Sequence, residues 1–320
     1  MPLMEPDRLA ELLSCPTCRS PLRSTGLGFI CSDGQCAMSK KVFPAAGGQP
    51  VLVDFADSIL AEDEVLQSGG GSAILRGGGM ARKSAVLRTM LPSNDVAENN
   101  ARRLLALAKQ SVERPVLLVV GGGSPGEGTA HLYDDPSIDL VGFDIYASPI
   151  TQFIADAHRI PLTDESVDAV WVQAVLEHVL DPWAVVAEIH RVLKHRGVVY
   201  AETPFMQQVH EGPYDFTRFT ESGHRWLFRK FDLIDSGVAL GPATQFLWSV
   251  DHLVRSVLRS VRAGILAKLA LFWIKYFDRL ADPRHAADSA SAVYFLGRKS
   301  DRTLGPREMI AHYKGAHSRR

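Results

Sequence analysis

Short apolar segments alternate with polar turns and amphipathic stretches over most of the chain. Residues 116–120 are all apolar, and a run of this length suits a buried strand. Helical patterns begin at residues 93–95 and run from Asp181 to Lys194. Because strands that alternate with helices are typical of layered α/β proteins, we expect an α/β fold. The other predicted strands end near Asp144, Asp156, Gln173 and Pro204 or cover residues 231–238 and 292–297.

The first predicted strand leads directly into a glycine-rich turn. Five glycines lie within residues 121–128, and glycine lets a backbone turn tightly and approach a ligand closely. The turn does not end in Gly-Lys-Ser/Thr, which excludes a Walker-type phosphate loop. A dinucleotide-type fingerprint fits better, but Gly-x-Gly alone is a weak signal. The residues that follow must therefore identify the ligand.

Two acidic residues end the second and third predicted strands. Asp144 closes the segment 138–144, and Asp156 follows twelve residues later. In doubly wound folds, an acid at the end of the second strand accepts hydrogen bonds from ribose hydroxyls. Capping of the adjoining turns is the alternative role for both carboxylates. The short spacing also predicts that the helix between these two strands is very short or absent.

Four short motifs follow in order along the chain. They are Asp-Ala-His-Arg-Ile-Pro at 156–161, Val-Asp-Ala-Val at 167–170, Leu-Glu-His-Val at 176–179 and Asp-Pro at 181–182. With the glycine turn, the series resembles the class I S-adenosylmethionine-dependent methyltransferases of the type 11 branch. The resemblance covers roughly residues 95–300 and implies a Rossmann-like, seven-stranded, mostly parallel sheet with flanking helices. It also implies S-adenosylmethionine as the cofactor.

The resemblance gives the glycine turn a role in cofactor binding. Gly121, Gly122 and Gly123 would let the backbone lie against the methionyl part of the donor. The N-terminus of the following helix would suit the donor carboxylate. Val119 departs from the family pattern, which usually has an acid at this position. A degenerate, non-catalytic domain is therefore kept as an alternative.

Further cofactor roles follow from the resemblance for residues at the strand ends. Asp144 would accept hydrogen bonds from the ribose hydroxyls, and Asp156 with Ala157 would lie beside the adenine. Gln173, at the end of the fourth strand, would face the amino-acid end of the donor.

All four cysteines lie near the N-terminus. Cys15 and Cys18 form a Cys-x2-Cys motif, Cys31 and Cys36 follow it, and residues 37–320 contain none. In a reducing compartment this clustering favours a metal over disulfides. Two cysteine pairs around a hairpin are the layout of a zinc ribbon, in which four thiolates make a closed, structural zinc site. The segment resembles the small zinc-ribbon proteins that activate methyltransferases. A ribbon without metal, with its thiols buried as small hydrophobic groups, is the alternative.

The segment after the fifth predicted strand carries the candidate acceptor chemistry. If the nucleophile is a hydroxyl, His210 is a suitable general base, because imidazole titrates near neutral pH. Asp215 would orient this histidine, and Arg218 could hold a carboxylate or phosphate of the acceptor. The alternative is that the three side chains only pin the loop through mutual hydrogen bonds.

The sequence also predicts how the chain is divided into domains. Residues 1–55 are expected to form the ribbon, and residues 56–92 a linker with short helical pieces or a mobile lid. Residues 93–300 would form the methyltransferase domain, with a helical insertion at 246–280 before the last strand, and residues 301–320 a disordered tail. The insertion has the pattern of two amphipathic helices broken near Gly264. It would be a cap or a dimer interface, or it would attach to a membrane surface.

Composition limits the partners and the location of the protein. The net charge is −1, so no general basic field favours nucleic acid as a partner. The N-terminal residues lack the features of a signal peptide, and no apolar run approaches the ~20 residues of a membrane span. We therefore expect a cytoplasmic protein, with peripheral membrane contact only through the insertion.

The sequence alone leaves several functions open. The leading hypothesis is an S-adenosylmethionine-dependent methyltransferase that acts on a small molecule or a glycan-like acceptor. An RNA methyltransferase that grips RNA through the ribbon is a second hypothesis, although the ribbon lacks a stripe of basic and aromatic residues. A non-catalytic partner module with the same fold is the third.

Overall fold

The computed structural model describes residues 1–71 and 94–317. Most of the predicted linker or lid therefore lies outside the described residues. Its first part contains η2 (Phe55–Asp57) and α2 (Glu62–Gln67). In the described part of the chain, no helix has both the length and the apolar composition needed to cross a bilayer.

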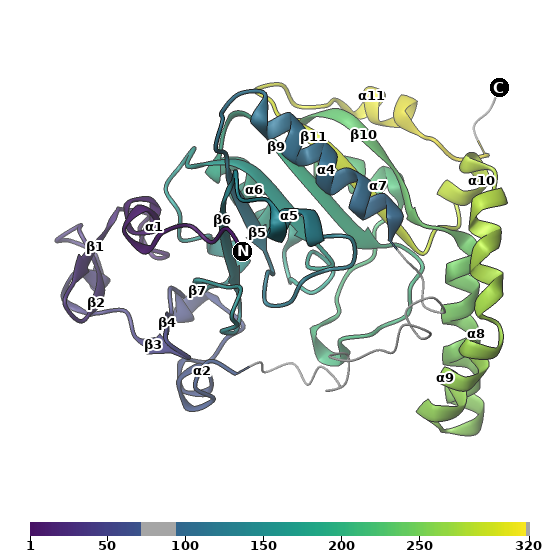
Figure 1. Ribbon diagram of the computed structural model, residues 1–320, viewed down its shortest axis with the longest axis horizontal. Coiled ribbons are helices and arrows are strands. Elements are labelled where there is room, and N and C mark those ends of the chain that lie inside the picture. Colours follow the sequence, from purple (N-terminus) through teal and green to yellow (C-terminus); the bar gives the residue numbers. More distant parts are fainter. Residues whose placement is uncertain (72–93, 318–320) are drawn as a thin grey trace.

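A seven-stranded sheet forms the centre of the molecule, with strand order β10-β11-β9-β8-β5-β6-β7 (Figure 1). The five strands from β9 to β7 run parallel, whereas β11 is antiparallel to both β9 and β10. The Rossmann-like, mostly parallel sheet implied by the resemblance is confirmed. Its strands are β5 (Val116–Val120), β6 (Asp139–Asp144), β7 (Phe153–Ile154), β8 (Val167–Gln173), β9 (Leu193–Pro204), β10 (Phe231–Leu240) and β11 (Ala292–Lys299).

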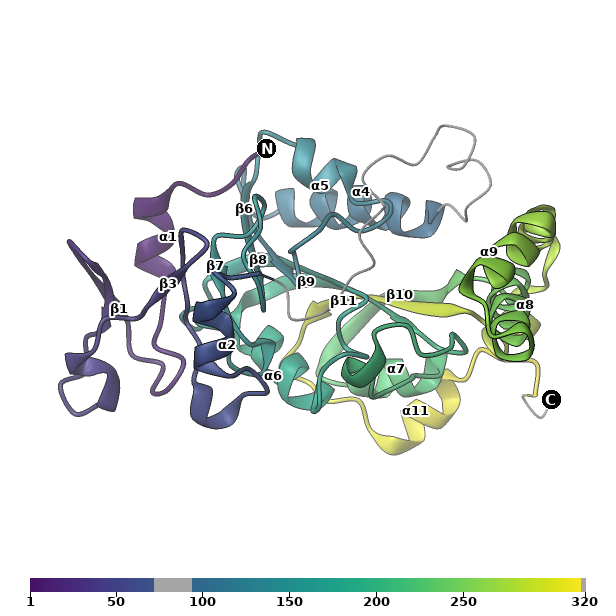
Figure 2. The same cartoon turned by 90° about the horizontal axis from the view of Figure 1, so that it is seen from below.

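Helices cover both faces of this sheet, which is why β5 and β6 are buried along their whole length (Figure 2). One face carries α4 (Asp95–Lys109) and α5 (Ala130–Asp134). The other carries α6 (Pro182–Val192), α7 (Glu221–Leu227) and α11 (Pro306–His312). The predicted start of α4 is confirmed, because the Asn94 side chain accepts a hydrogen bond from the Ala97 N–H at 2.9 Å. No helix separates β6 from β7, as their spacing predicted.

The N-terminal segment is built onto the edge of the sheet. Leu3 pairs with Leu140 of β6, and Val51 pairs with Ile154 of β7. Leu13 belongs to the same apolar core cluster as the strands. The elements of this segment are α1 (Pro6–Leu12), β1 (Leu22–Thr25), β2 (Gly28–Cys31), η1 (Ala37–Lys40), β3 (Ala45–Ala46) and β4 (Gln49–Pro50).

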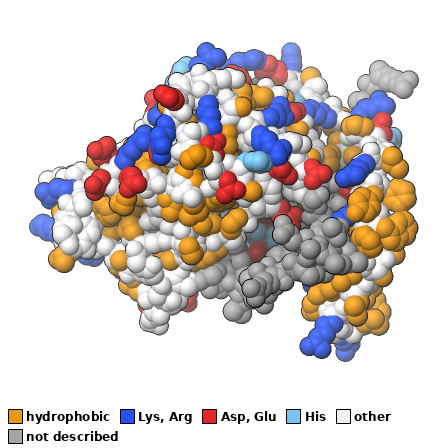
Figure 3. All heavy atoms as spheres, viewed as in Figure 1, with side chains coloured by type: hydrophobic (Ala, Val, Ile, Leu, Met, Phe, Trp, Pro, Cys, Tyr) orange, Lys and Arg blue, Asp and Glu red, His pale blue; other side chains and the backbone are white. Residues whose placement is uncertain are grey.

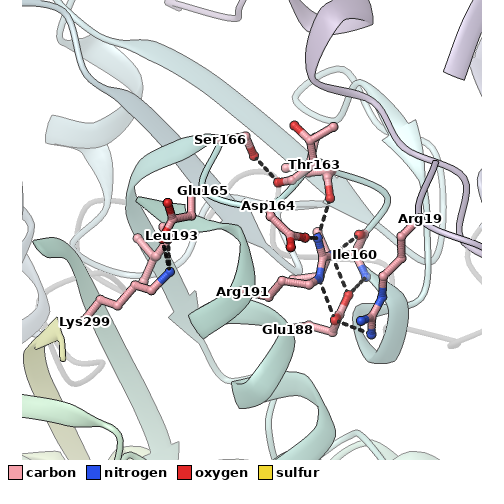
Figure 4. Close-up of polar contacts among 11 residues, drawn as sticks. Arg19, Ile160, Thr163, Asp164, Glu165, Ser166, Glu188, Arg191, Leu193 and Lys299 are labelled. Atoms are coloured by element: carbon pink, nitrogen blue, oxygen red, sulfur yellow. Dashed lines mark hydrogen bonds and ion pairs between the residues drawn. The ribbon is translucent and has the colours of Figure 1, made fainter. Parts of the chain in front are cut away.

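A buried carboxylate on α6 also holds this segment (Figure 4). Glu188 accepts hydrogen bonds from Arg19 at 3.0 Å, from the Ile160 N–H at 3.0 Å and from Arg191 at 2.6 and 2.8 Å. Arg19 directly follows Cys18 in the sequence. The cysteine hairpin is therefore attached to a helix that covers the sheet.

The helical insertion differs from its sequence prediction. It consists of α8 (Pro242–Leu258), α9 (Val261–Ala270) and η6 (Phe272–Leu280). The helices are broken at Arg259, where φ is 50°, and not near Gly264. Gly264 lies inside α9 and faces α8, since an added Cβ would come within 2.3 Å of the Asp251 carboxylate. The glycine thus permits a close helix–helix approach instead of ending a helix.

The predicted disordered tail is also corrected by the structure. Part of residues 301–320 forms α11, whose His312 lies 2.9 Å from the Glu221 carboxylate of α7. Lys314 donates a hydrogen bond to the Ser236 carbonyl of β10 at 2.7 Å. These long-range polar contacts order a segment whose own composition predicts no packed structure.

Candidate functional site

Two cavities adjoin at the carboxyl ends of the parallel strands. Their volumes are about 80 and 490 Å³, and Gly121, Ala174 and His178 line both. Open α/β sheets bind ligands at this edge. The smaller cavity is also lined by Phe143, Asp144, Asp156, Ala157, Val179 and others, and the larger one by Asn94, Gln173, Glu177, Glu202, His210 and others.

Gly121 and Gly123 lie where the folded chain itself leaves no room for a side chain. Gly121 has φ +69°, and an added Cβ would come within 2.3 Å of the Val175 side chain. A Cβ on Gly123 would come within 2.3 Å of the Tyr146 ring, while the Gly122 N–H donates to the Phe143 carbonyl. The predicted helix does not follow at once. Helix α5 begins only at Ala130 and has five residues, so no long helix presents its N-terminus to this turn.

Asp144 both caps the glycine turn and lines the smaller cavity. Its carboxylate accepts hydrogen bonds from the Gly123 N–H at 2.8 Å and from the Ile145 N–H at 2.7 Å. The capping alternative therefore describes a real contact. It does not exclude a ligand, because the two oxygens of a carboxylate together offer about four acceptor positions.

Asp156 has a similar double position. It caps η4 (Ala157–Arg159), accepts from Ser58 Oγ at 2.5 Å, and lies 2.6 Å from His158 Nδ1. Burial alone would raise the pKa of Asp156, but the hydrogen bonds from His158 and Ser58 lower it. Asp156 lines the smaller cavity together with Ile59, so the segment after the ribbon contributes to the cavity wall.

Gln173 joins the glycine turn to an acid that the sequence analysis missed. Its Nε2 donates to the Glu127 carbonyl at 3.2 Å and to Glu202 at 3.4 Å. Glu202 is buried and accepts from Tyr200 Oη at 2.6 Å and from Asn94 Nδ2 at 2.7 Å, while burial raises its pKa. Its position near the end of β9, like those of the acids after β6 and β7, was the available signal.

A second missed acid lies at the floor of the larger cavity. Ala174 directly follows β8 and has φ 53°, a conformation that residues with a side chain rarely adopt, and the chain then turns to place Glu177 and His178 in the cavity wall. Burial raises the pKa of Glu177 to about 8 and lowers the pKa of His178 to about 4. His210 lines the same cavity, and the centroid of its ring is 5.0 Å from that of the His178 ring. In the sequence, the Leu-Glu-His-Val motif served only as a family marker.

Asp215 and Arg218 line neither cavity, and Asp215 accepts a hydrogen bond from the His210 N–H at 2.9 Å. All five guanidinium N–H groups of Arg218 are used inside the loop, on both Asp215 oxygens and on the carbonyls of Gln207, Gln208 and Thr217. Burial alone would raise the pKa of Asp215, but the bonds from Arg218 lower it to about 2. This geometry favours the alternative in which both residues pin the loop.

The four cysteines form a cluster around the hairpin β1–β2, which lies at the end of the molecule opposite α8 and α9 (Figure 1). One sulfur from each of Cys15, Cys18, Cys31 and Cys36 lies within 4.8 Å of the other three. A tetrahedral zinc with Zn–S bonds of about 2.3 Å separates its sulfurs by about 3.8 Å, so the donor set and its spacing fit zinc. The cluster is consistent with a zinc ribbon.

Comparison with known proteins finds one family match and a number of similar structures. Residues 118–201 match the family described as a methyltransferase domain. No curated protein matches the sequence. One similar structure is a putative sarcosine dimethylglycine methyltransferase from Galdieria sulphuraria, at 18% identity, with 68% of this chain and 87% of that chain covered and a TM-score of 0.42. Another is a 1,6-didemethyltoxoflavin N1-methyltransferase from Burkholderia thailandensis, at 14% identity, with 64% and 80% covered and a TM-score of 0.37.

The matched region extends from β5 to β9 and thus contains the glycine turn, the acids after β6 and β7, and the strand that leads to Glu177. These elements form both cavities at one edge of the sheet. The family match and the seven-stranded sheet around it together indicate an S-adenosylmethionine-dependent methyltransferase domain in this part of the chain.

Proposed function

We propose that this methyltransferase transfers the methyl group of S-adenosylmethionine to a small-molecule or glycan-like acceptor bound in the larger cavity. The observation that carries the proposal is the shared wall of the two cavities at Gly121, Ala174 and His178. A donor whose adenosine lies against the residues of the smaller cavity, which is too small to enclose it, would direct its methionyl part into the larger one. The volume of about 490 Å³ lies within the ~300–1,000 Å³ of small-molecule sites.

In this proposal, Asp144 accepts hydrogen bonds from the ribose, Asp156 and Ala157 lie beside the adenine, and Gln173 faces the amino-acid end of the donor. The cavity positions of these residues support the assignment. Methyl transfer is an in-line displacement, so the protein mainly aligns the nucleophile, the methyl carbon and the sulfur.

Calorimetric titration with S-adenosylmethionine tests the donor site. Asp144→Ala should weaken binding by about 1.5–3 kcal/mol, because charge-assisted hydrogen bonds to the ribose are lost. Asp301→Ala, a change at an exposed position beyond β11, is the control and should bind like the wild type. Absence of binding to the wild type, or equal binding to both variants, would rule out this assignment.

We further propose that His210 takes part in activating the nucleophile of the acceptor, and that Asp215 and Arg218 are positioning residues. Of these three residues, His210 lines the larger cavity, whereas Asp215 and Arg218 do not and instead fix the loop backbone. His210→Ala should lower turnover by ~10²–10⁴-fold and leave donor affinity nearly unchanged. Wild-type turnover in this variant would leave His210 with a structural role only, and loss of donor binding would place it in the cofactor pocket.

We propose that the four cysteines hold one structural zinc, and that the insertion contacts an anionic membrane surface. Leu253, Val257 and Leu258 of α8 are each more than 60% exposed, and apolar side chains gather over this part of the molecule (Figure 3). The acids Asp251 and Asp278 are used inside the insertion, which leaves basic residues such as Arg259 and Arg262 at its surface.

Co-flotation with phosphatidylserine-containing vesicles tests the membrane proposal. The wild type should float with these vesicles and not with purely zwitterionic ones, and Leu253→Ser with Val257→Ser should abolish flotation. Leu27→Ser removes a leucine of the N-terminal hairpin that is even more exposed, and it is the control. A wild type that fails to float but elutes as a dimer would assign the surface to a second copy instead.

A further inference from the structure

The larger cavity contains three side chains whose arrangement suits a cation. Glu177, His178 and His210 each offer one ligand atom, and these atoms lie within 4.8 Å of one another. Oε1 of Glu177 is 3.6 Å from Nε2 of His178 and 3.9 Å from Nε2 of His210. Ligand atoms about 2.1 Å from a metal ion lie about 3.0–3.4 Å from one another, so a small closure completes the geometry.

The carboxylate of Glu177 provides a second, independent observation. The residue is fully buried, and neither carboxylate oxygen has a hydrogen-bond partner among the described residues. A buried polar group without a partner is costly, and such groups in native proteins require an explanation. The nearby Arg218 cannot supply the partner, because its N–H groups are all bonded within the loop. A cation bound beside Glu177 would supply a partner for its carboxylate.

Both imidazoles are oriented as metal ligands are. Nδ1 of His178 lies 2.7 Å from the Tyr214 carbonyl, so the proton is on Nδ1 and the Nε2 lone pair faces Glu177. Nδ1 of His210 lies 3.2 Å from the Gln208 carbonyl, which again leaves Nε2 on the side of Glu177. Metal-binding histidines commonly donate their second ring N–H to a backbone carbonyl in this way.

We propose that Glu177 Oε1, His178 Nε2 and His210 Nε2 together bind one divalent first-row transition-metal ion in the larger cavity. Two imidazoles and one carboxylate suit manganese, iron, cobalt or zinc better than magnesium or calcium, which prefer oxygen ligands. Three protein ligands leave coordination positions open toward the cavity. This cation site is separate from the cysteine cluster, whose residues Cys15, Cys18, Cys31 and Cys36 line neither cavity.

The bound ion also indicates which chemical class of acceptor the site would take, and this part of the inference rests on the proposed methyl transfer. A divalent cation lowers the pKa of a bound hydroxyl group, which then loses its proton to solvent at neutral pH. The acceptor oxygen forms a bond to the methyl carbon as the carbon–sulfur bond breaks, and the electron pair stays on sulfur, which becomes a neutral thioether. The acceptor is then an alcohol or a phenol. His210 acts as a ligand, and the cation takes over the activation of the nucleophile.

Titration of the full-length, zinc-loaded protein with Mn²⁺, followed by electron paramagnetic resonance and calorimetry, tests the site. Mn²⁺ is chosen because hard cations avoid thiolates, which keeps the cysteine cluster out of the measurement. One equivalent should bind to the wild type. Glu177→Gln and His210→Gln should each weaken binding at least tenfold. His195→Gln, at an exposed position at the opposite end of β9, should not change it.

S-adenosylmethionine affinity is measured on the same preparations and separates the two proposals. If the wild type binds S-adenosylmethionine but no Mn²⁺, or if the two variants bind Mn²⁺ as well as the wild type does, the cation site is overturned and the proposed transfer is unaffected. If the wild type binds Mn²⁺ but no S-adenosylmethionine, the proposed function fails and the cation site stands. Retained donor binding in Glu177→Gln shows that this variant is folded.

Discussion

Two regions have been added to the same sheet, and they are attached in opposite ways. In the N-terminal segment, residues 1–71, Leu13, Cys15 and Cys31 are buried in the apolar cluster of the sheet itself. In the insertion, residues 242–280, the apolar side chains of α8 and η6 largely face outward. The first region extends a core, and the second carries an apolar surface away from it.

The difference shows how each region is held together. The N-terminal segment has β1, β2 and other very short elements, and it depends on pairing with the sheet edge and on contacts such as Arg19–Glu188. The insertion is closed on itself: the buried Asp251 pairs with Arg255 at 2.6 Å and with Lys268 at 2.9 Å. We therefore expect the N-terminal segment to share the global unfolding transition and the insertion to open separately.

Removal of the proposed zinc should give the largest effect. Because Cys15 and Cys31 belong to the sheet's own apolar cluster, chelation or Cys15→Ser should destabilise the whole domain by several kcal/mol. This corresponds to a fall in melting temperature on the order of 10 °C. Calorimetry with and without chelator measures it, and the chelator should have no further effect on Cys15→Ser. Elemental analysis that finds well under half an equivalent of zinc would contradict the prediction.

A pair of leucine substitutions compares the two regions directly. Leu13 is 1% exposed and Leu253 is 64% exposed. Leu13→Ala should lower the free energy of unfolding by about 2–5 kcal/mol, because it leaves a cavity in the core. Leu253→Ala should change it by less than about 0.5 kcal/mol. Denaturant titration measures both, and similar losses would mean that α8 packs against a surface in solution.

Asp251→Ala tests whether the insertion opens by itself. The change removes the carboxylate between Arg255 and Lys268, so α9 should detach from α8 at a cost of about 1–3 kcal/mol. In hydrogen exchange, residues 261–270 should lose about 5- to 150-fold protection, with the sheet strands unchanged. A uniform loss of protection across β5 and β8 would show that the insertion is part of the global core.

Arg8→Ala should give only a small effect on stability. Arg8 forms an ion pair with Asp139, but its side chain is about half exposed, and Asp139 also pairs with Arg114 at 2.7 Å. Exposed ion pairs contribute less than about 1 kcal/mol, so we expect a loss below that value. A loss of more than 2 kcal/mol in denaturant titration would show that polar contacts hold the N-terminal segment as firmly as its core does.

The candidate site was predictable where each residue belongs to an ordered motif. The glycine turn and the acids Asp144 and Asp156 follow predicted strands, and the structure places them at one edge of the sheet. The role of Arg218 was not predictable in this way. Whether its guanidinium faces an acceptor or the loop depends on which carbonyls the folded loop turns toward it, and the sequence contains no such information.

The sequence by itself determined the sheet, the glycine turn and the cysteine cluster. The reason is that the spacing of apolar residues, the acids at strand ends and the spacing of the cysteines are local properties of the chain. Tertiary structure alone decided the rest. It brought Glu177, His178 and His210 together from segments 32 residues apart, ordered α11, and turned the apolar side of the insertion outward. The physical reason is that a side chain's burial and partners depend on which distant segments pack against it, and those contacts exist only in the folded chain.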